Sequence, residues 1–85
     1  NFDVEFSDEI KSVTSEIKIT DKSLVSGNHL MDLGLPEKTI VVMVKRDGKY
    51  FVPNGKTILN ENDKLLVITD DQAALKETYT RLGFN

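Results

Sequence analysis

Two apolar runs joined by an aspartate–glycine pair constrain the fold of this chain more than any other feature. Thr39–Val44 is apolar and β-branched apart from one methionine, and a second apolar run follows Asp47-Gly48. Asp-Gly favours a two-residue type I′ turn, in which both central residues take positive φ. Such a turn would place Val44 opposite Phe51. The sequence therefore predicts a β-hairpin whose first strand lies at the sheet centre, covered on both faces.

Two stretches near the start of the chain alternate apolar and polar residues, which is the period of a strand. Phe2–Phe6 predicts a lead-in strand, and a brief helix is expected from Ser7. Ile17 and Ile19 predict a second strand that ends near Asp21. Residues 1–14 are interpreted as a lead-in from an upstream linker, and residues 15–85 as one domain.

Short apolar segments after the hairpin predict further strands. Pro53 cannot donate to a ladder, so the hairpin should end there or lie at an edge. Thr57–Leu59 is predicted to be a brief strand, and Leu65–Ile68 a buried one. Asn62 lies in the polar turn between them and tolerates a left-handed conformation.

Helical spacing appears twice. Leu30 and Leu33 are three residues apart, and Gly34 and a proline follow them, which predicts a short helix. The spacing of Thr69 and Gln72 fits a capping box at the start of a second helix. The apolar face of that helix would carry Leu75, Tyr79 and Leu82, with Phe84 packed on Tyr79. The predicted fold class is α+β, a small and mostly antiparallel sheet with a short helix after the first strands and a C-terminal amphipathic helix.

Size and charge limit the function classes. A chain of 85 residues without cysteine builds a thin core that a partner surface would help to stabilise, so self-association is expected. The longest apolar run is too short to span a bilayer, which indicates a soluble piece. The net charge of −3 argues against nucleic acid as a partner.

Catalytic residues are not indicated. An enzyme would need a nucleophile with its base, an acid–base pair or a metal cluster. His29 is the single histidine, and no cysteine accompanies it as a metal ligand. We therefore expect no enzymatic activity, no catalytic cofactor and no metal site.

The order and spacing of several motifs resemble the TrkA-C or RCK-C family, the C-terminal regulatory domain of bacterial potassium transport proteins. The resemblance runs from about Ser15 to Leu82. The matching residues are Ser23, Val25, Gly27, Leu30, Leu33 and Leu35, then Val42–Gly48, then Pro53, Gly55 and Thr57, and finally Asp63, Leu65, Leu66 and Val67. Asn62 replaces the usual glycine and keeps the capacity for positive φ.

This resemblance implies a function in transport. Within the family, the sequence of residues 35–53 is most similar to the cytoplasmic tail of potassium or sodium/proton antiporters of the cell-volume-regulation type. It implies a homodimer on the cytoplasmic side of the cell membrane, acting on a membrane transport domain of the same or a partner chain. It also implies regulation by a small ligand, in some members cyclic di-AMP, held at the dimer cleft by the segment from the first strand to the first helix.

That segment supplies the predicted ligand site. Asn28 and His29 begin a short helix, where free N–H groups favour an anion such as a phosphate. Ile17, Ile19 and Val25 would form an apolar wall for an adenine. Lys22 is the cation of this segment that could meet a phosphate. The predicted site residues are Ile17, Ile19, Asp21, Lys22, Val25, Asn28 and His29. The same polar residues also fit a solvated helix start, and the apolar ones also fit core packing.

A second interpretation is an AbrB-like swapped-hairpin regulator that binds DNA. Residues 45–53 followed by residues 62–67 resemble that family's pattern of Gly-Arg, three hydrophobic residues and a proline, with a later Gly-Asp. The family places a helix with an arginine between the proline and Gly-Asp. Residues 54–62 instead contain two turn signals and no apolar period, so the transport interpretation is preferred.

Overall fold

The computed structural model describes residues 13–84 of the chain. Its elements in chain order are β1 (Thr14–Lys18), η1 (Asp21–Leu24), η2 (Leu30–Leu33), β2 (Thr39–Arg46), β3 (Lys49–Phe51), β4 (Lys64–Thr69) and α2 (Gln72–Arg81). Here η1 and η2 are one-turn 3₁₀-helices. The strand predicted at Phe2–Phe6 and the helix predicted from Ser7 lie outside the described residues.

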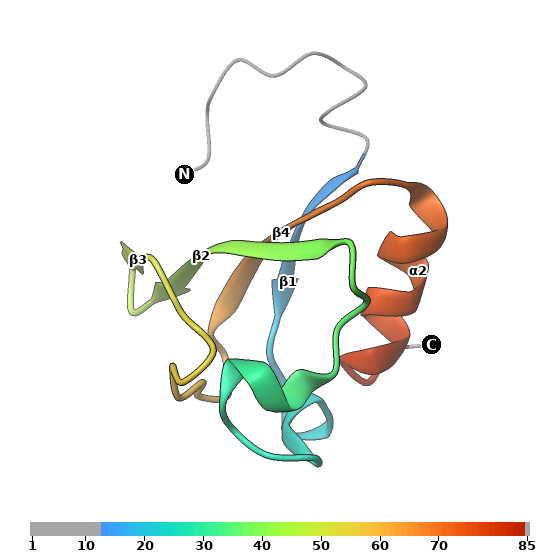
Figure 1. The fold of residues 1–85 in the computed structure, drawn as a ribbon. Coiled ribbons are helices and arrows are strands. Elements are labelled where there is room, and N and C mark those ends of the chain that lie inside the picture. Colours follow the sequence, from blue (N-terminus) through green and yellow to red (C-terminus); the bar gives the residue numbers. More distant parts are fainter. Residues whose placement is uncertain (1–12, 85) are drawn as a thin grey trace.

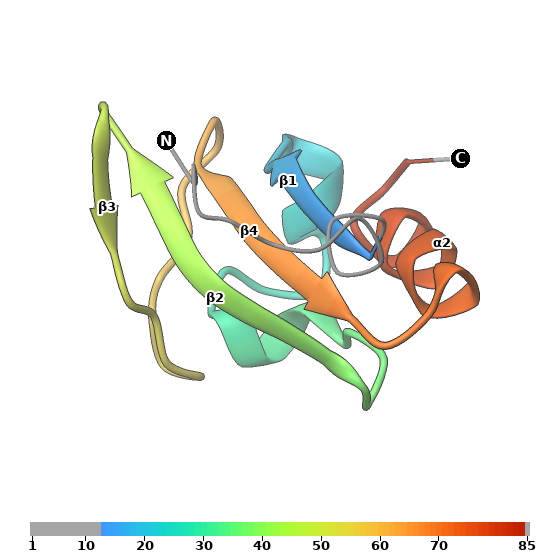
Figure 2. The same ribbon diagram turned by 90° about the horizontal axis from the view of Figure 1, so that it is seen from above.

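The four strands form one antiparallel sheet in the order β1-β4-β2-β3. Figure 2 shows this order, with α2 beside β1, and Figure 1 shows both 3₁₀-helices on one side of the sheet. The predicted α+β fold is confirmed. No helix among the described residues has the length and apolarity needed to cross a bilayer.

The hairpin forms in the predicted register. Val44 lies opposite Phe51, and the next two pairs also match the expected alignment. Asp47 and Gly48 both take positive φ, of 52° and 79°, as a type I′ turn requires. β3 ends before Pro53 at the edge of the sheet.

The core lies on the side of the sheet that faces the short helices. It is formed by the buried residues Ile17, Ile19, Leu33, Val44, Leu59, Leu65, Val67 and Leu82. Ile40 on β2 is 64% exposed, so the prediction that this strand is covered on both faces was wrong. The more deeply buried strand is β4, in which Leu65, Leu66 and Val67 are all buried. Continuous apolar runs mark both strands, so the run alone did not separate them.

The C-terminal helix is capped by a side chain at its start and by backbone hydrogen bonds at its end. Asp71 is its N-cap and accepts a 2.7 Å hydrogen bond from the backbone N–H of Ala74. The predicted capping box at Thr69 was therefore wrong, because the Thr69 hydroxyl donates instead to the Asp71 carbonyl. At the other end, the Phe84 N–H donates to the Tyr79 carbonyl at 2.9 Å in a Schellman arrangement. The Phe84 ring packs on the Tyr79 ring, as expected, and the two rings meet edge to face.

Two further predictions need correction. Thr57–Leu59 is not a strand and makes only an isolated bridge, between Ile58 and His29. The chain between β1 and β2 contains two one-turn helices, of which the sequence predicted only the second. The first was missed because Asp21–Leu24 contains a single apolar residue and so shows no helical spacing.

Candidate functional site

The predicted ligand residues divide into a buried pair and an exposed group. Ile17 and Ile19 are 2% and 0% exposed and belong to the core. Val25 is 81% exposed, and Asp21, Lys22 and Asn28 are also exposed. His29 keeps 40% of its side chain exposed. We call residues 21–33, which contain η1, η2 and the exposed group, the candidate segment.

The first half of the candidate segment is fixed by Ser23. Its hydroxyl is buried, accepts a 3.0 Å hydrogen bond from the backbone N–H of Thr20, and donates a 2.6 Å bond to the Leu82 carbonyl. The serine thus attaches η1 to the C-terminal end of α2. Sequence reasoning found Ser23 as part of a motif but did not find this role, because Leu82 is distant along the chain.

The second half of the candidate segment is built around Asp32. Its Oδ2 accepts a 3.0 Å bond from the backbone N–H of His29 and lies 3.3 Å from the His29 Nδ1. Gly27 has φ +135°, and a Cβ there would lie 2.4 Å from the same oxygen. Only glycine fits both the backbone angle and the carboxylate. No motif singled out Asp32, whose only signal was its position three residues after His29.

A neighbouring loop, residues 53–63, holds the candidate segment through the backbone. The N–H groups of Leu30 and Met31 donate to the carbonyls of Thr57 and Gly55 at 2.9 and 3.0 Å. The Leu59 N–H donates to the Asn28 carbonyl at 2.7 Å. The two irregular stretches therefore support each other by sheet-like bonds although neither forms a strand.

An ion pair between the buried Asp63 and the partly exposed Arg46 lies at the end of that loop. Asp63 is 2% exposed, and its two oxygens accept from the Arg46 Nε and Nη2 at 2.9 and 2.7 Å. Burial alone would raise the pKa of Asp63. The hydrogen bonds from Arg46 and from the backbone N–H of Asn60, with the guanidinium charge, instead hold it below its ordinary value. The hydrogen bond to Asp63 raises the pKa of Arg46, against the opposing effect of its burial.

The exposed group of the candidate segment combines apolar surface with polar side chains. Val25 offers apolar surface, and Lys22, Asn28 and His29 offer hydrogen-bond donors from the same segment. Within residues 13–84 no three carboxylate or imidazole side chains come close enough together to hold a metal ion.

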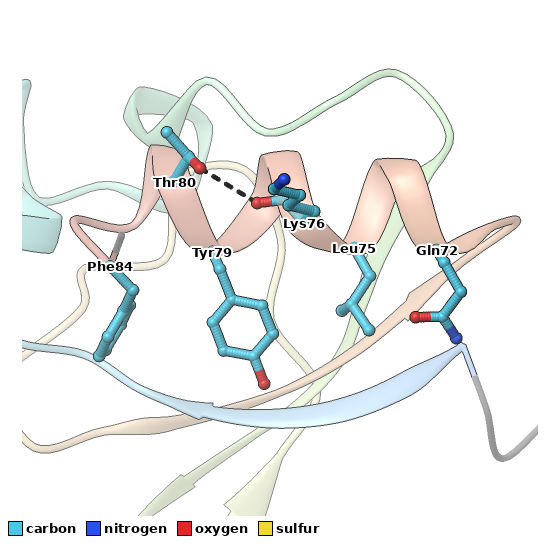
Figure 3. Close-up of a pocket in the computed structure, with 6 residues that line it drawn as sticks. All are labelled: Gln72, Leu75, Lys76, Tyr79, Thr80 and Phe84. Carbon is cyan, nitrogen blue, oxygen red and sulfur yellow. Dashed lines mark hydrogen bonds between the residues drawn. The ribbon is translucent and has the colours of Figure 1, made fainter.

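A separate open groove of about 390 Å³ runs along α2. It is lined by Gln72, Leu75, Lys76, Tyr79, Thr80 and Phe84. Figure 3 shows the Leu75 and Tyr79 side chains projecting from one side of α2, and the Phe84 side chain, which follows the helix, pointing the same way. None of the predicted ligand residues contributes to this groove, so the molecule offers two distinct surfaces.

Comparison with known sequences places this geometry in a family. The model of the TrkA-C domain matches residues 14–83. A Trk system potassium uptake protein TrkA homologue of Methanosarcina mazei is 32% identical over 66 residues, and one of Archaeoglobus fulgidus is 29% identical over 63. These matches cover 78% and 72% of this chain. The matched part spans only 16% and 14% of those relatives.

Solved structures share the fold. A structure described as an RCK domain with cda has a TM-score of 0.65 at 25% identity, covering 82% of this chain and 97% of that one. The RCK_C domain dimer of S. agalactiae BusR in complex with c-di-AMP has a TM-score of 0.68 at 17% identity, covering 86% and 93%. A longer BusR chain, solved with its busAB-promotor DNA, has a TM-score of 0.69 at 17% identity, and the match covers 95% of this chain but 40% of that one.

Proposed function

The chain belongs to the TrkA-C domain family, and we propose that it is a non-catalytic regulatory domain of a potassium or other cation transport system. The observation that carries this proposal is the family match across residues 14–83, supported by relatives described as potassium uptake proteins. In this proposal residues 15–85 form the regulatory domain and residues 1–14 lead in from an upstream linker. The transport domain, in the finer form a cation/proton antiporter, belongs to the same or a partner chain, with this domain on the cytoplasmic side of the membrane.

The proposed ligand is a cyclic dinucleotide, cyclic di-AMP, held by the candidate segment at the cleft of a homodimer. The descriptions of the BusR and RCK structures support this ligand class. In this chain Val25 offers apolar surface for a base, and Lys22, Asn28 and His29 offer donors for phosphate oxygens. Asp21 is an exposed acceptor for the ligand's amino or hydroxyl groups. Ile17 and Ile19 would act from beneath, as the buried floor that supports the segment.

Regulation would follow from differential affinity. A ligand that contacts both subunits binds best to one relative orientation of the dimer and so raises the population of that orientation. The transport domain would sense the change through the chain that connects it to this domain. A ligand with equal affinity for both orientations would bind without regulating.

DNA binding by an AbrB-like swapped hairpin is the weaker interpretation. Residues 54–62 form a loop and not the arginine-bearing helix of that family. The net charge of −3 also disfavours binding to the polyanionic backbone of duplex DNA, where many phosphates must be neutralised by basic side chains. Salt-dependent micromolar binding of random duplex DNA at low salt would favour this alternative over the transport proposal.

Calorimetric titration with cyclic di-AMP, with other nucleotides and with monovalent cations as comparisons, tests the proposed ligand. We expect saturable binding with one ligand per dimer. Lys22→Ala and His29→Ala should each weaken it by about tenfold, which corresponds to about 1.4 kcal/mol. Lys76→Ala is the matched control, because that exposed lysine lines the groove on α2. Absence of saturable heat for any nucleotide, or a strict monomer in sedimentation at high micromolar concentration, would contradict the proposal.

A further inference from the structure

We infer that Arg46 is a positioning residue for the candidate segment, acting through Asp63 and loop 53–63 without contacting the ligand. The importance of that position for ligand binding rests on the proposed function. The mechanical part of the inference, that Arg46 holds the segment in its conformation, stands on contacts in the structure alone.

The first step is the attachment of the loop to the sheet. Arg46 is the last residue of β2, and its guanidinium makes three hydrogen bonds to loop 53–63. Two go to the Asp63 carboxylate, and the third goes from Nη2 to the Ile58 carbonyl at 2.9 Å. The guanidinium carbon also lies 5.1 Å from the centre of the Phe51 ring, which fixes its orientation from the other strand of the hairpin.

The second step is the attachment of the candidate segment to that loop. At the entrance to the segment, the Ile19 N–H donates to the Asp63 carbonyl at 2.7 Å, and the Asn62 N–H donates to the Ile19 carbonyl at 2.8 Å. At its far end, three backbone bonds join residues 28–31 to residues 55–59. Both ends of the exposed group that includes Val25 and Asn28 are therefore held by one loop, and Arg46 fastens that loop at two points.

Apart from these bonds, the candidate segment is held by the Ser23 hydroxyl on the Leu82 carbonyl and by the buried Leu33. Leu24 and Leu30 are partly buried against the core. η1 and η2 are four residues each, and 3₁₀ turns of that length are not stable by themselves. The loop in turn buries one large apolar side chain, Leu59, at 2% exposure. The loop is otherwise attached by the hydrogen bonds that the 2%-exposed Asp63 accepts from Arg46 and from the Asn60 N–H.

Lysine cannot replace arginine in this arrangement. The guanidinium is a planar fork that reaches both carboxylate oxygens and a carbonyl at once, whereas an ammonium is a single point charge. Arg46→Lys therefore keeps the charge and removes the geometry. The chain has one other arginine, Arg81, which lies on α2 at 3.5 Å from Glu77 in an exposed pair. Arg81→Lys is thus a control with the same chemical change.

Amide hydrogen exchange tests the inference without any ligand. In Arg46→Lys we expect the backbone amides of Leu30, Met31 and Leu59 to lose protection by about tenfold or more relative to the amides of β4. This is the pattern of local rather than global opening. Arg81→Lys should leave those three amides unchanged. Unchanged protection in Arg46→Lys, or a loss that is equal in the loop and in β4, would overturn the inference.

Titration of the same variants with cyclic di-AMP tests the link to binding. Arg46→Lys should weaken the ligand by about fivefold or more while Arg81→Lys matches the wild type, because a disordered segment must be reordered at each binding event. If the wild-type chain binds no nucleotide, the proposed function fails while the exchange experiment still decides the mechanical part. Equal affinity of Arg46→Lys and wild type, with lost amide protection, would overturn the assignment of Arg46 to ligand binding.

Discussion

The sheet with its C-terminal helix and the paired irregular stretches, residues 21–33 and 53–63, are held together by different forces. The sheet and helix enclose most of the buried apolar side chains, such as Val44, Leu65 and Leu82. The irregular stretches contribute Leu33 and Leu59 to that core, with Leu24 and Leu30 packed against it. Beyond these contacts they depend on polar bonds: backbone hydrogen bonds, the Ser23 bond to the Leu82 carbonyl and the Arg46–Asp63 ion pair. Stability is therefore concentrated in one region, and the exposed groups proposed to bind ligand are carried by the other.

The largest expected effect comes from removing a buried side chain from the sheet and its C-terminal helix, which we call the apolar region. Residues 21–33 and 53–63 are called the irregular region. Leu65 is fully buried on β4, opposite Ile17 on one side and Val44 on the other. Leu65→Ala should lower the free energy of unfolding by about 2–5 kcal/mol, from lost burial and the cavity that remains. Urea denaturation followed by circular dichroism measures this change.

Ile40→Ala is the control for that substitution, because Ile40 is a strand residue of the same sheet that is 64% exposed. Its unfolding free energy should change by about 0.5 kcal/mol or less. A loss at Ile40 as large as that at Leu65 would contradict the assignment of the core to one side of the sheet.

A smaller effect is expected from the ion pair, and it depends on pH. The pKa of Asp63 is lowered in the folded state. The ionised carboxylate therefore stabilises the fold at pH values above the ordinary aspartate pKa of 3.8. That contribution is lost as pH falls through the lower folded pKa. Asp63→Asn should be less stable than wild type by about 1–3 kcal/mol at neutral pH. Urea denaturation should show the difference shrinking below about pH 4, near the unfolded pKa of aspartate. A difference that stays constant with pH would argue against an ionised Asp63.

The smallest effect is expected at the helix N-cap. Asp71→Ala removes the acceptor for the Ala74 N–H and should cost about 1 kcal/mol. Because this cap belongs to the apolar region, amide exchange should speed up in the first turn of α2 and not at Leu30 or Leu59. Faster exchange at those two amides, relative to β4, would show that the two regions are not separable in this way.

The same division explains which features the sequence could predict. The hairpin register followed from Asp47-Gly48 alone, and α2 followed from the helical spacing of Leu75 and Tyr79, because both patterns are local. For Ile17 the sequence left two alternatives, core packing and a wall of the ligand site. The fold buries its side chain in the core.

The irregular stretches could not be predicted in this way. Their hydrogen bonds join residues that are far apart in the chain, such as Asn28 with Leu59 and Arg46 with Asp63. No periodicity reports such pairs. Loop 53–63 was therefore predicted to contain a strand, and Asp32 and Ser23 had no assigned role although each makes a specific contact.

The central claim is that the irregular region, and not the groove on α2, receives the ligand. Amide chemical shifts of the full chain during titration with cyclic di-AMP test this most directly, because both surfaces are reported in one spectrum. We expect saturable shifts concentrated in residues 21–33, with Val25, Asn28 and His29 among the largest. Shifts confined to the groove residues between Gln72 and Phe84, or no saturable shifts at all, would contradict it.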